Sequence, residues 1–86
     1  MLKGFAMAGE RQCVEVSYIG NPETPSAVCA MGALQLGRYG NANHIFESTC
    51  NVSTAFYNAT GIFITTANDE GMSIPDIAGI LASEGY

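Results

Sequence analysis

Cys29, His44 and Asp69 supply the residue types of a thiol nucleophile, a general base and a group that orients the base. Asn68 is an alternative orienting group, and Gln12 could donate a hydrogen bond to an oxyanion. The competing interpretation is that Cys29 is a core residue, because cysteine is among the most buried residue types. We favour the core interpretation and expect no catalytic residue, since 86 residues leave little room for a substrate cleft.

Metal binding is the second chemistry that the residue types allow. Cys13, Cys29, His44 and Cys50 are zinc-ligating types, but their wide separations contain no closely spaced ligand pair. Asn68–Gly71 has part of the composition of a calcium loop without the alternating ligands of an EF-hand. We therefore expect neither a metal nor another cofactor, and three scattered cysteines do not form a disulfide framework.

The charge pattern excludes several classes of partner. The chain carries a net charge of −5 and only 13% charged residues, and its basic residues Lys3, Arg11 and Arg38 are scattered. Nucleic acids and anionic membrane surfaces bind clustered basic residues, so we expect neither partner. The apolar runs are shorter than the roughly 20 residues of a membrane span, and no signal-peptide core is present. We therefore expect a cytoplasmic protein.

The weakly charged surface favours association, since surfaces with few charges stick to one another more readily. We therefore expect a homo-oligomer, and a protein partner or a small-molecule ligand. Tyr18 and Tyr39 are candidate interface residues because tyrosine is enriched at binding hot spots. The polar pair Asn68 and Asp69 is a further candidate contact with a ligand or partner.

The first half of the chain must position Cys29 with short elements. Residues 2–10 contain helix formers, and residues 13–19 contain the β-branched and aromatic residues of an extended segment. Two prolines and a Gly-Asn pair predict a loop over residues 20–25. Ser26 is then the expected N-cap of a buried helix over Ala27–Gly37, which is apolar on nearly every side.

Glycines divide and end that expected helix. Gly32 lies inside it, where glycine costs about 1 kcal/mol relative to alanine, so we expect close approach of another backbone. Gly37 and Gly40 are the expected stop signals. Arg38 suits the negative end of the helix dipole.

The second half contains one ambiguous stretch and one clear helix. Residues 41–60 fit both a helical stripe and a strand alternation, and we favour the helix. Residues 62–66 have strand propensity but could also form one buried helical turn, and residues 68–71 read as a turn. Ser73 is the N-cap of the clearest helix, which ends at Gly85 and whose apolar residues recur at steps of three and four.

Length and these elements together set the fold class. At 86 residues, 48% of them hydrophobic, the chain forms one domain with a modest core. The sequence predicts a mainly α fold: a single domain over residues 1–86 with three to four short helices and one short extended segment or hairpin.

Three motifs carry a resemblance to a known family. The run Cys-Ala-Met-Gly-Ala-Leu at Cys29–Leu34, the run ending in Asn-Asp at Ile64–Asp69 and the helix over residues 73–81 follow one another. In this order they resemble a family of unknown function in bacteria and phages, domain of unknown function 6197, and Gln12 is similar to a glutamine in its extended segment. Ala67 stands where the family usually has tryptophan, which removes a large aromatic side chain. The resemblance implies a fold but no activity, because the family has none assigned.

We therefore expect a small non-enzymatic accessory protein that acts by binding, either inhibiting a host defence protein or sequestering a small molecule. The resemblance and the compact size indicate a phage-encoded protein that works in the host cytoplasm. The alternatives are a thiol enzyme centred on Cys29 and a structural subunit of a virion or other assembly.

Overall fold

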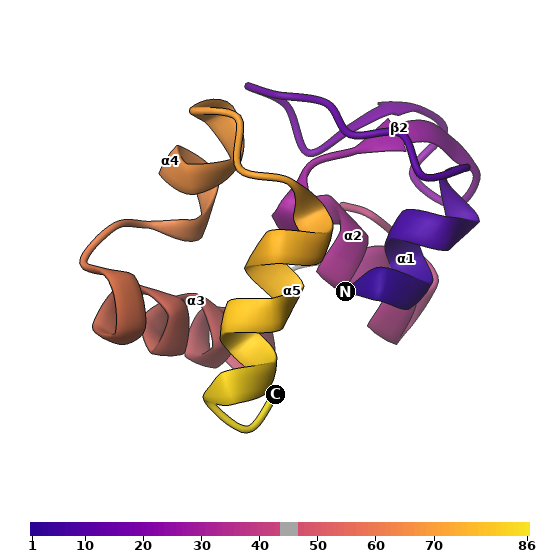
Figure 1. Ribbon diagram of the computed structural model, residues 1–86. Coiled ribbons are helices and arrows are strands. Elements are labelled where there is room, and N and C mark those ends of the chain that lie inside the picture. The colour runs from indigo at the N-terminus through magenta and orange to yellow at the C-terminus, as the bar shows by residue number, and fades with distance from the viewer. Residues whose placement is uncertain (44–46) are drawn as a thin grey trace.

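This computed structural model describes residues 1–43 and 47–86. They contain five helices and a two-stranded hairpin, joined by loops (Figure 1). The mainly α fold with a small hairpin is confirmed, with one helix more than expected. The additional helix lies in the region of residues 62–66, for which the sequence allowed either a strand or a helical turn. In chain order the elements are α1 (Leu2–Met7), β1 (Tyr18–Gly20), β2 (Pro25–Val28), α2 (Ala30–Tyr39), α3 (Glu47–Thr60), α4 (Ile64–Asp69) and α5 (Ile74–Ser83).

The hairpin packs against the beginning of α2. β1 and β2 pair in antiparallel fashion, with Tyr18 opposite Val28. On the other side of β2, Gln12 forms a parallel bridge with Val28, and the Cys13 N–H donates a hydrogen bond to the Val28 carbonyl at 2.9 Å. Strand β2 is therefore held from both sides, and Val28 is completely buried.

The beginning of α2 differs from the sequence prediction. Ser26 does not cap a helix and Ala27 does not begin one, because both residues lie in β2. The helix begins at Ala30 with Cys29 as its N-cap, and the Gly32 N–H donates a hydrogen bond to the Cys29 Sγ at 3.4 Å. The prediction was wrong because an apolar run without clear periodicity fits a buried strand as well as a buried helix. Pairing with β1 decides between them.

The extended segment predicted over residues 13–19 forms a strand only from Tyr18 onward. Glu15 has a φ of +68°, in the left-handed region, which interrupts the extended backbone. Val14 and Val16 are 48% and 51% exposed, so the alternation of apolar residues does not mark a buried face.

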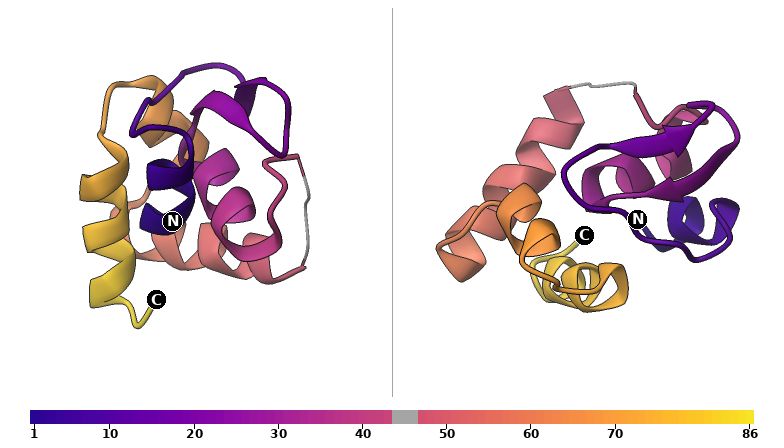
Figure 2. Two further views of the ribbon diagram at one scale, coloured as in Figure 1. Left: turned by 90° about the vertical axis from the view of Figure 1, so that its right-hand side faces the viewer. Right: turned by 90° about the horizontal axis from the view of Figure 1, so that it is seen from above.

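Glycines allow the closest contacts of α2. A Cβ atom on Gly32 would overlap the Ser17 carbonyl, which confirms the predicted close approach of another backbone. A Cβ atom on Gly4 would likewise overlap the Ala33 carbonyl, and one on Gly37 would lie 2.9 Å from the Gly4 nitrogen. Helix α1 therefore packs backbone against backbone on α2, and Figure 2 shows the two helices side by side.

Helix α2 ends at Gly40 and not at Gly37. Gly40 has a φ of +70° and its N–H donates a hydrogen bond to the Leu36 carbonyl at 2.9 Å. This left-handed position at a helix C-terminus favours glycine. Arg38 lies in the last turn, as predicted, where a cation interacts favourably with the helix dipole.

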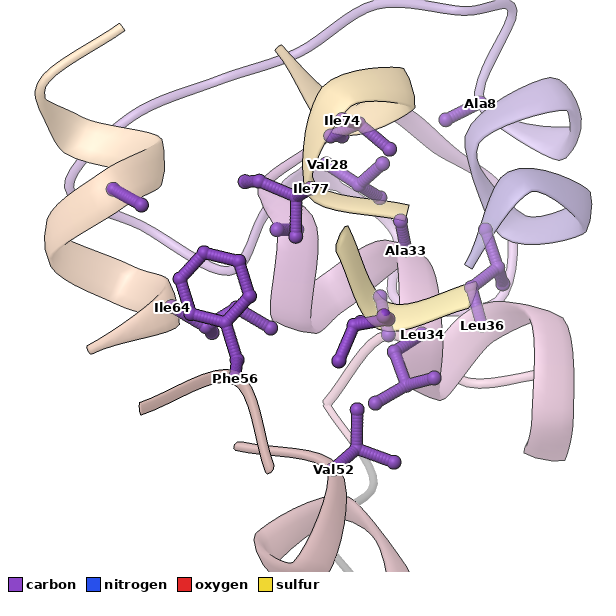
Figure 3. Close-up of a cluster of buried hydrophobic side chains, with 14 residues drawn as sticks. Ala8, Val28, Ala33, Leu34, Leu36, Val52, Phe56, Ile64, Ile74 and Ile77 are labelled. Atoms are coloured by element: carbon purple, nitrogen blue, oxygen red, sulfur yellow. The ribbon is translucent and has the colours of Figure 1, made fainter. Parts of the chain in front are cut away.

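The second half of the chain closes the core. The helix expected within residues 41–60 is present as α3, and the Ser73 hydroxyl caps α5 by accepting a hydrogen bond from the Asp76 N–H at 3.3 Å. None of the helices in the described residues has the length and apolar character needed to cross a membrane. Figure 3 shows Ala8, the residue after α1, and side chains from β2 and the later helices pointing into one interior. The largest fully buried side chains are Phe56, Leu36, Ile64, Ile74, Ile77, Val28, Val52 and the polar Asn68.

Candidate functional site

Cys29 is buried where β2 meets α2, with its N–H donating a hydrogen bond to the Ser17 carbonyl at 3.0 Å. Burial raises the pKa of the Cys29 thiol above its ordinary value. Hydrogen bonds from the Gly32 and Met31 N–H groups lower this pKa in part, and the Asp69 carboxylate raises it further. Because the thiolate is the nucleophilic form, a thiol with a raised pKa stays protonated and weakly reactive at neutral pH.

Asn68 connects three segments of the chain through its side-chain amide. Its Oδ1 accepts hydrogen bonds from the Gln12 Nε2 at 2.7 Å and from the Ala30 N–H at 3.0 Å. Its Nδ2 donates a hydrogen bond to the Cys13 carbonyl at 2.9 Å. The side chain is 1% exposed, so these bonds satisfy an amide that is out of contact with water.

Gln12 extends this network to the last helix. Its Nε2 also donates a hydrogen bond to the Met72 carbonyl at 2.9 Å, and its Oε1 accepts one from the Ile74 N–H at 2.8 Å. The Ile74 N–H belongs to the first turn of α5, where backbone donors lack a partner within the helix. Gln12 therefore fixes the beginning of α5 against the N-terminal segment, and its amide is occupied by structural hydrogen bonds.

Asp69 makes the corresponding contact at the surface. Its Oδ1 accepts a hydrogen bond from the Glu15 N–H at 2.9 Å. Asn68 and Asp69 both lie in the last turn of α4, and not in the turn predicted over residues 68–71. The helix places the Asn68 side chain inward and the Asp69 side chain outward, toward the segment between α1 and β1.

A small cavity brings together three of the residues that the sequence suggests for thiol chemistry. Cys29, Asn68 and Asp69 line it, and its volume is about 130 Å³. His44, the proposed base, lies outside the described residues. The volume is well below the range of about 300 Å³ and more that is usual for ligand pockets. The remaining lining residues are Glu15, Val16, Ser17, Met31 and Thr65.

The other residues singled out in the sequence lie apart. Tyr18 is half-buried against the core, and Tyr39 is exposed at the end of α2. Neither tyrosine lines the small cavity or a second, larger cavity that lies beside α1 and α5. Cys13 is buried and Cys50 is exposed, and both are free thiols. Within residues 1–43 and 47–86, no three or more Cys, His, Asp or Glu side chains are arranged to hold a metal ion.

A larger cavity of about 330 Å³ opens beside α1 and α5, and we call it the α1–α5 cavity. Buried apolar side chains of α2, α3 and α5 form its walls, and Leu2 and Tyr86 are exposed at its edge. Figure 2 shows in both views that the first and last residues of the chain lie close together, and Met1 and Tyr86 both line this cavity. The cavity is lined by Met1, Leu2, Lys3, Leu34, Arg38, Val52, Ala78, Leu81, Ala82 and Tyr86.

Among the side chains that the structure describes, two cationic ones and no acidic one line the α1–α5 cavity. They are Lys3 and Arg38, two of the three basic residues of the chain. Sequence reasoning missed this pair because Lys3 and Arg38 stand 35 positions apart and read as scattered charges. Only the packing of α1 on α2 through Gly4 and Gly37 brings them to one cavity, and no local signal in the sequence predicts that contact.

Comparisons of the chain with protein-family models, with curated proteins and with solved structures found no match. The resemblance to a family of unknown function therefore stays a prediction, and the cavities themselves are the basis on which a function can be inferred.

Proposed function

We propose that this protein acts by binding a small organic ligand in the α1–α5 cavity, without catalysing a reaction. The observation that carries the proposal is the cavity itself: about 330 Å³, open to solvent, with apolar walls from several helices. This volume lies within the range of about 300–1,000 Å³ that is typical of ligand pockets, and predominantly apolar walls are their usual lining. Sequestration of a small molecule is the corresponding biological role.

The apolar walls supply the affinity in this proposal. Leu34, Val52 and Leu81 line the cavity from three different helices and are almost completely buried. The apolar surface that a ligand can cover belongs to Leu2, Ala82 and Tyr86, which are exposed. A ligand that covers apolar surface gains roughly 25 cal/mol for each Å² removed from water. Because the walls belong to the packed core, the cavity exists before the ligand binds, which reduces the entropy lost on binding.

The small cavity gives less support to a function. Its volume is about 130 Å³, and the side chains of Asn68 and Asp69 are engaged in hydrogen bonds to the backbone. The raised pKa of Cys29 also gives no support to a thiol enzyme. The larger cavity is therefore the better candidate for the functional site.

Fluorescence titration with two dyes tests the proposal: the uncharged phenylnaphthylamine, and anilinonaphthalene sulfonate, which has the same rings. We expect saturable binding with one site per chain. Ala82 is exposed and lines the cavity, so Ala82→Trp should fill it and weaken binding about tenfold or more. Ala59→Trp is the matched control, since Ala59 is exposed on α3 and does not line the cavity.

The near-ultraviolet circular dichroism of each variant must match that of the parent, because these dyes also bind partly folded states. The proposal is wrong if neither dye binds saturably to the folded parent. It is also wrong if Ala82→Trp leaves both titrations unchanged.

A further inference from the structure

We propose that the ligand of the α1–α5 cavity is an amphiphilic anion, with its anionic group between Lys3 and Arg38 and its apolar part against the exposed side chains of Leu2, Ala82 and Tyr86. The anionic group is a carboxylate, phosphate or sulfonate, and the molecule is free in solution. This inference rests on the proposed function, because it names the class of ligand for the same cavity.

The distribution of charge is the first argument. The chain has eight acidic residues and three basic ones, yet both of the described charged side chains that line this cavity are basic. In the part of the chain that the structure describes, neither Lys3 nor Arg38 forms an ion pair with a carboxylate. A local positive charge in an acidic protein attracts an anion and disfavours a cation. With no acidic partner among the described residues, the two cations are available to a ligand.

The positions of the two side chains are the second argument. A Cβ atom on Gly37 would lie 3.6 Å from the Lys3 Cβ, so Lys3 begins beside the last turn of α2, next to Arg38. Arg38 and Met1 line the same cavity, and the pKa of the Met1 amino group is lowered by burial and further by the Arg38 charge. One anionic group can therefore contact an ammonium and a guanidinium, and guanidinium binds carboxylate or phosphate with two parallel hydrogen bonds.

The apolar walls are the third argument, because they exclude a small inorganic anion as the preferred ligand. An inorganic phosphate would contact the two cations and leave the exposed apolar surface of Leu2, Ala82 and Tyr86 in contact with water. A molecule with both an anionic group and an apolar part satisfies the cations and covers the walls together. At about 330 Å³, near the lower end of ligand pockets, the cavity suits a single short amphiphile.

Comparing the affinities for the two dyes separates the contribution of the charge from that of the apolar contact, because the dyes differ only by the sulfonate. Lys3→Gln and Arg38→Gln should each weaken the sulfonate dye about two- to fivefold, the range for an exposed charge pair. Both variants should weaken binding of phenylnaphthylamine less than binding of the sulfonate dye, because the uncharged dye makes no ion pair. Arg11→Gln is the matched control: it removes the third basic residue, which is exposed and does not line the cavity.

Salt and natural amphiphiles give independent readouts. Raising the ionic strength from 0.01 to about 0.15 M should weaken binding of the sulfonate dye and leave the uncharged dye unaffected, because salt screens exposed charges. Decanoate should displace the bound dye at lower concentration than decanol. The protein should not sediment with phosphatidylglycerol vesicles, and sedimentation would indicate a membrane lipid in place of a free ligand.

The inference is overturned if Lys3→Gln and Arg38→Gln change both dyes equally or change neither. An equal effect of Arg11→Gln would also overturn it, since that result would indicate the net charge and not the cavity. In these cases loss of both dyes in Ala82→Trp would leave the proposed function intact. Failure of both dyes to bind the folded parent would overturn both proposals.

Discussion

The side-chain oxygen Oδ1 of Asn68 lies 2.7 Å from the Nε2 of Gln12, although 56 positions separate the two residues in the chain. The same oxygen accepts the Ala30 N–H, and Gln12 also bonds the first turn of α5. Two neutral amides therefore join the N-terminal segment, the beginning of α2, the end of α4 and the beginning of α5. They satisfy backbone groups that would otherwise be buried without a partner.

Replacing Asn68 should cost more stability than replacing its neighbour Asp69. We expect Asn68→Ala to lower the free energy of unfolding by about 2–4 kcal/mol, because it leaves the Ala30 N–H and the Cys13 carbonyl without partners. Asp69→Ala should cost about 0.5–1.5 kcal/mol, since its bond to the Glu15 N–H is exposed. Urea denaturation followed by circular dichroism measures both losses.

Asn58→Ala is the control for this pair, because Asn58 is exposed on α3 and should change stability by less than about 0.5 kcal/mol. A folded Asn68→Ala variant as stable as Asn58→Ala would show that the amide network does not hold the elements together.

Gly32 and Gly79 provide a matched pair of helix glycines. Gly32→Ala should destabilise the protein by about 1–3 kcal/mol or more, because the added Cβ would overlap the Ser17 carbonyl. Gly79→Ala should stabilise it by up to about 1 kcal/mol, because nothing lies within 4 Å of the new Cβ and alanine is the better helix former. Midpoints of urea denaturation compare the two variants, and a shift of the same sign in both would contradict the close packing of α2.

Gly40 tests the end of α2. Its φ is +70°, in the left-handed region, where a Cβ atom costs roughly 1–2 kcal/mol although the surrounding space is open. We expect Gly40→Ala to lower the melting temperature by several degrees and Gly40→Asn to lower it less, because asparagine tolerates this conformation better. Equal melting temperatures for Gly40→Ala and the parent would mean that Gly40 does not cap α2 in the left-handed conformation.

The buried thiols predict a loss of stability at alkaline pH. Burial raises the pKa of Cys13 and of Cys29 above the ordinary value of 9.0, so the folded protein holds these protons more tightly than the unfolded chain. This contribution is complete below about pH 9 and is lost as the pH rises through the folded-state values. Urea denaturation at pH 7 and pH 10 should show the loss, and Cys13→Ala with Cys29→Ala should reduce it.

Iodoacetamide at neutral pH provides a second measurement on the same thiols. Cys50 is exposed and should react first, whereas Cys13 and Cys29 should react fully only after denaturation. Rapid alkylation of Cys29 in the folded protein would favour a thiol enzyme over the proposed binding protein.

Local patterns in the sequence determined much of the helical structure. Ser73 followed by Pro75 and Asp76 is an N-terminal signal whose bonds form within one turn, and the structure has the cap where the pattern predicts it. The apolar spacing of residues 41–60 likewise predicted α3, and Gly32 within an apolar run predicted a close backbone contact. The cap and the helical spacing depend on neighbours a few positions away, which a sequence shows directly, whereas the sequence predicted the close contact of Gly32 without its partner, Ser17.

Tertiary structure decided what depends on distant partners. Residues 26–28 are a strand because β1 and the Gln12 segment lie on either side of them, and their apolar composition alone also fits a helix. The same holds for the candidate site: Lys3 and Arg38 become one cationic pair only because Gly4 lets α1 contact α2 without side chains between them. Contacts between residues far apart in the sequence leave no periodic trace in the chain, so the packing of the helices created the cavity that the residue types could not predict.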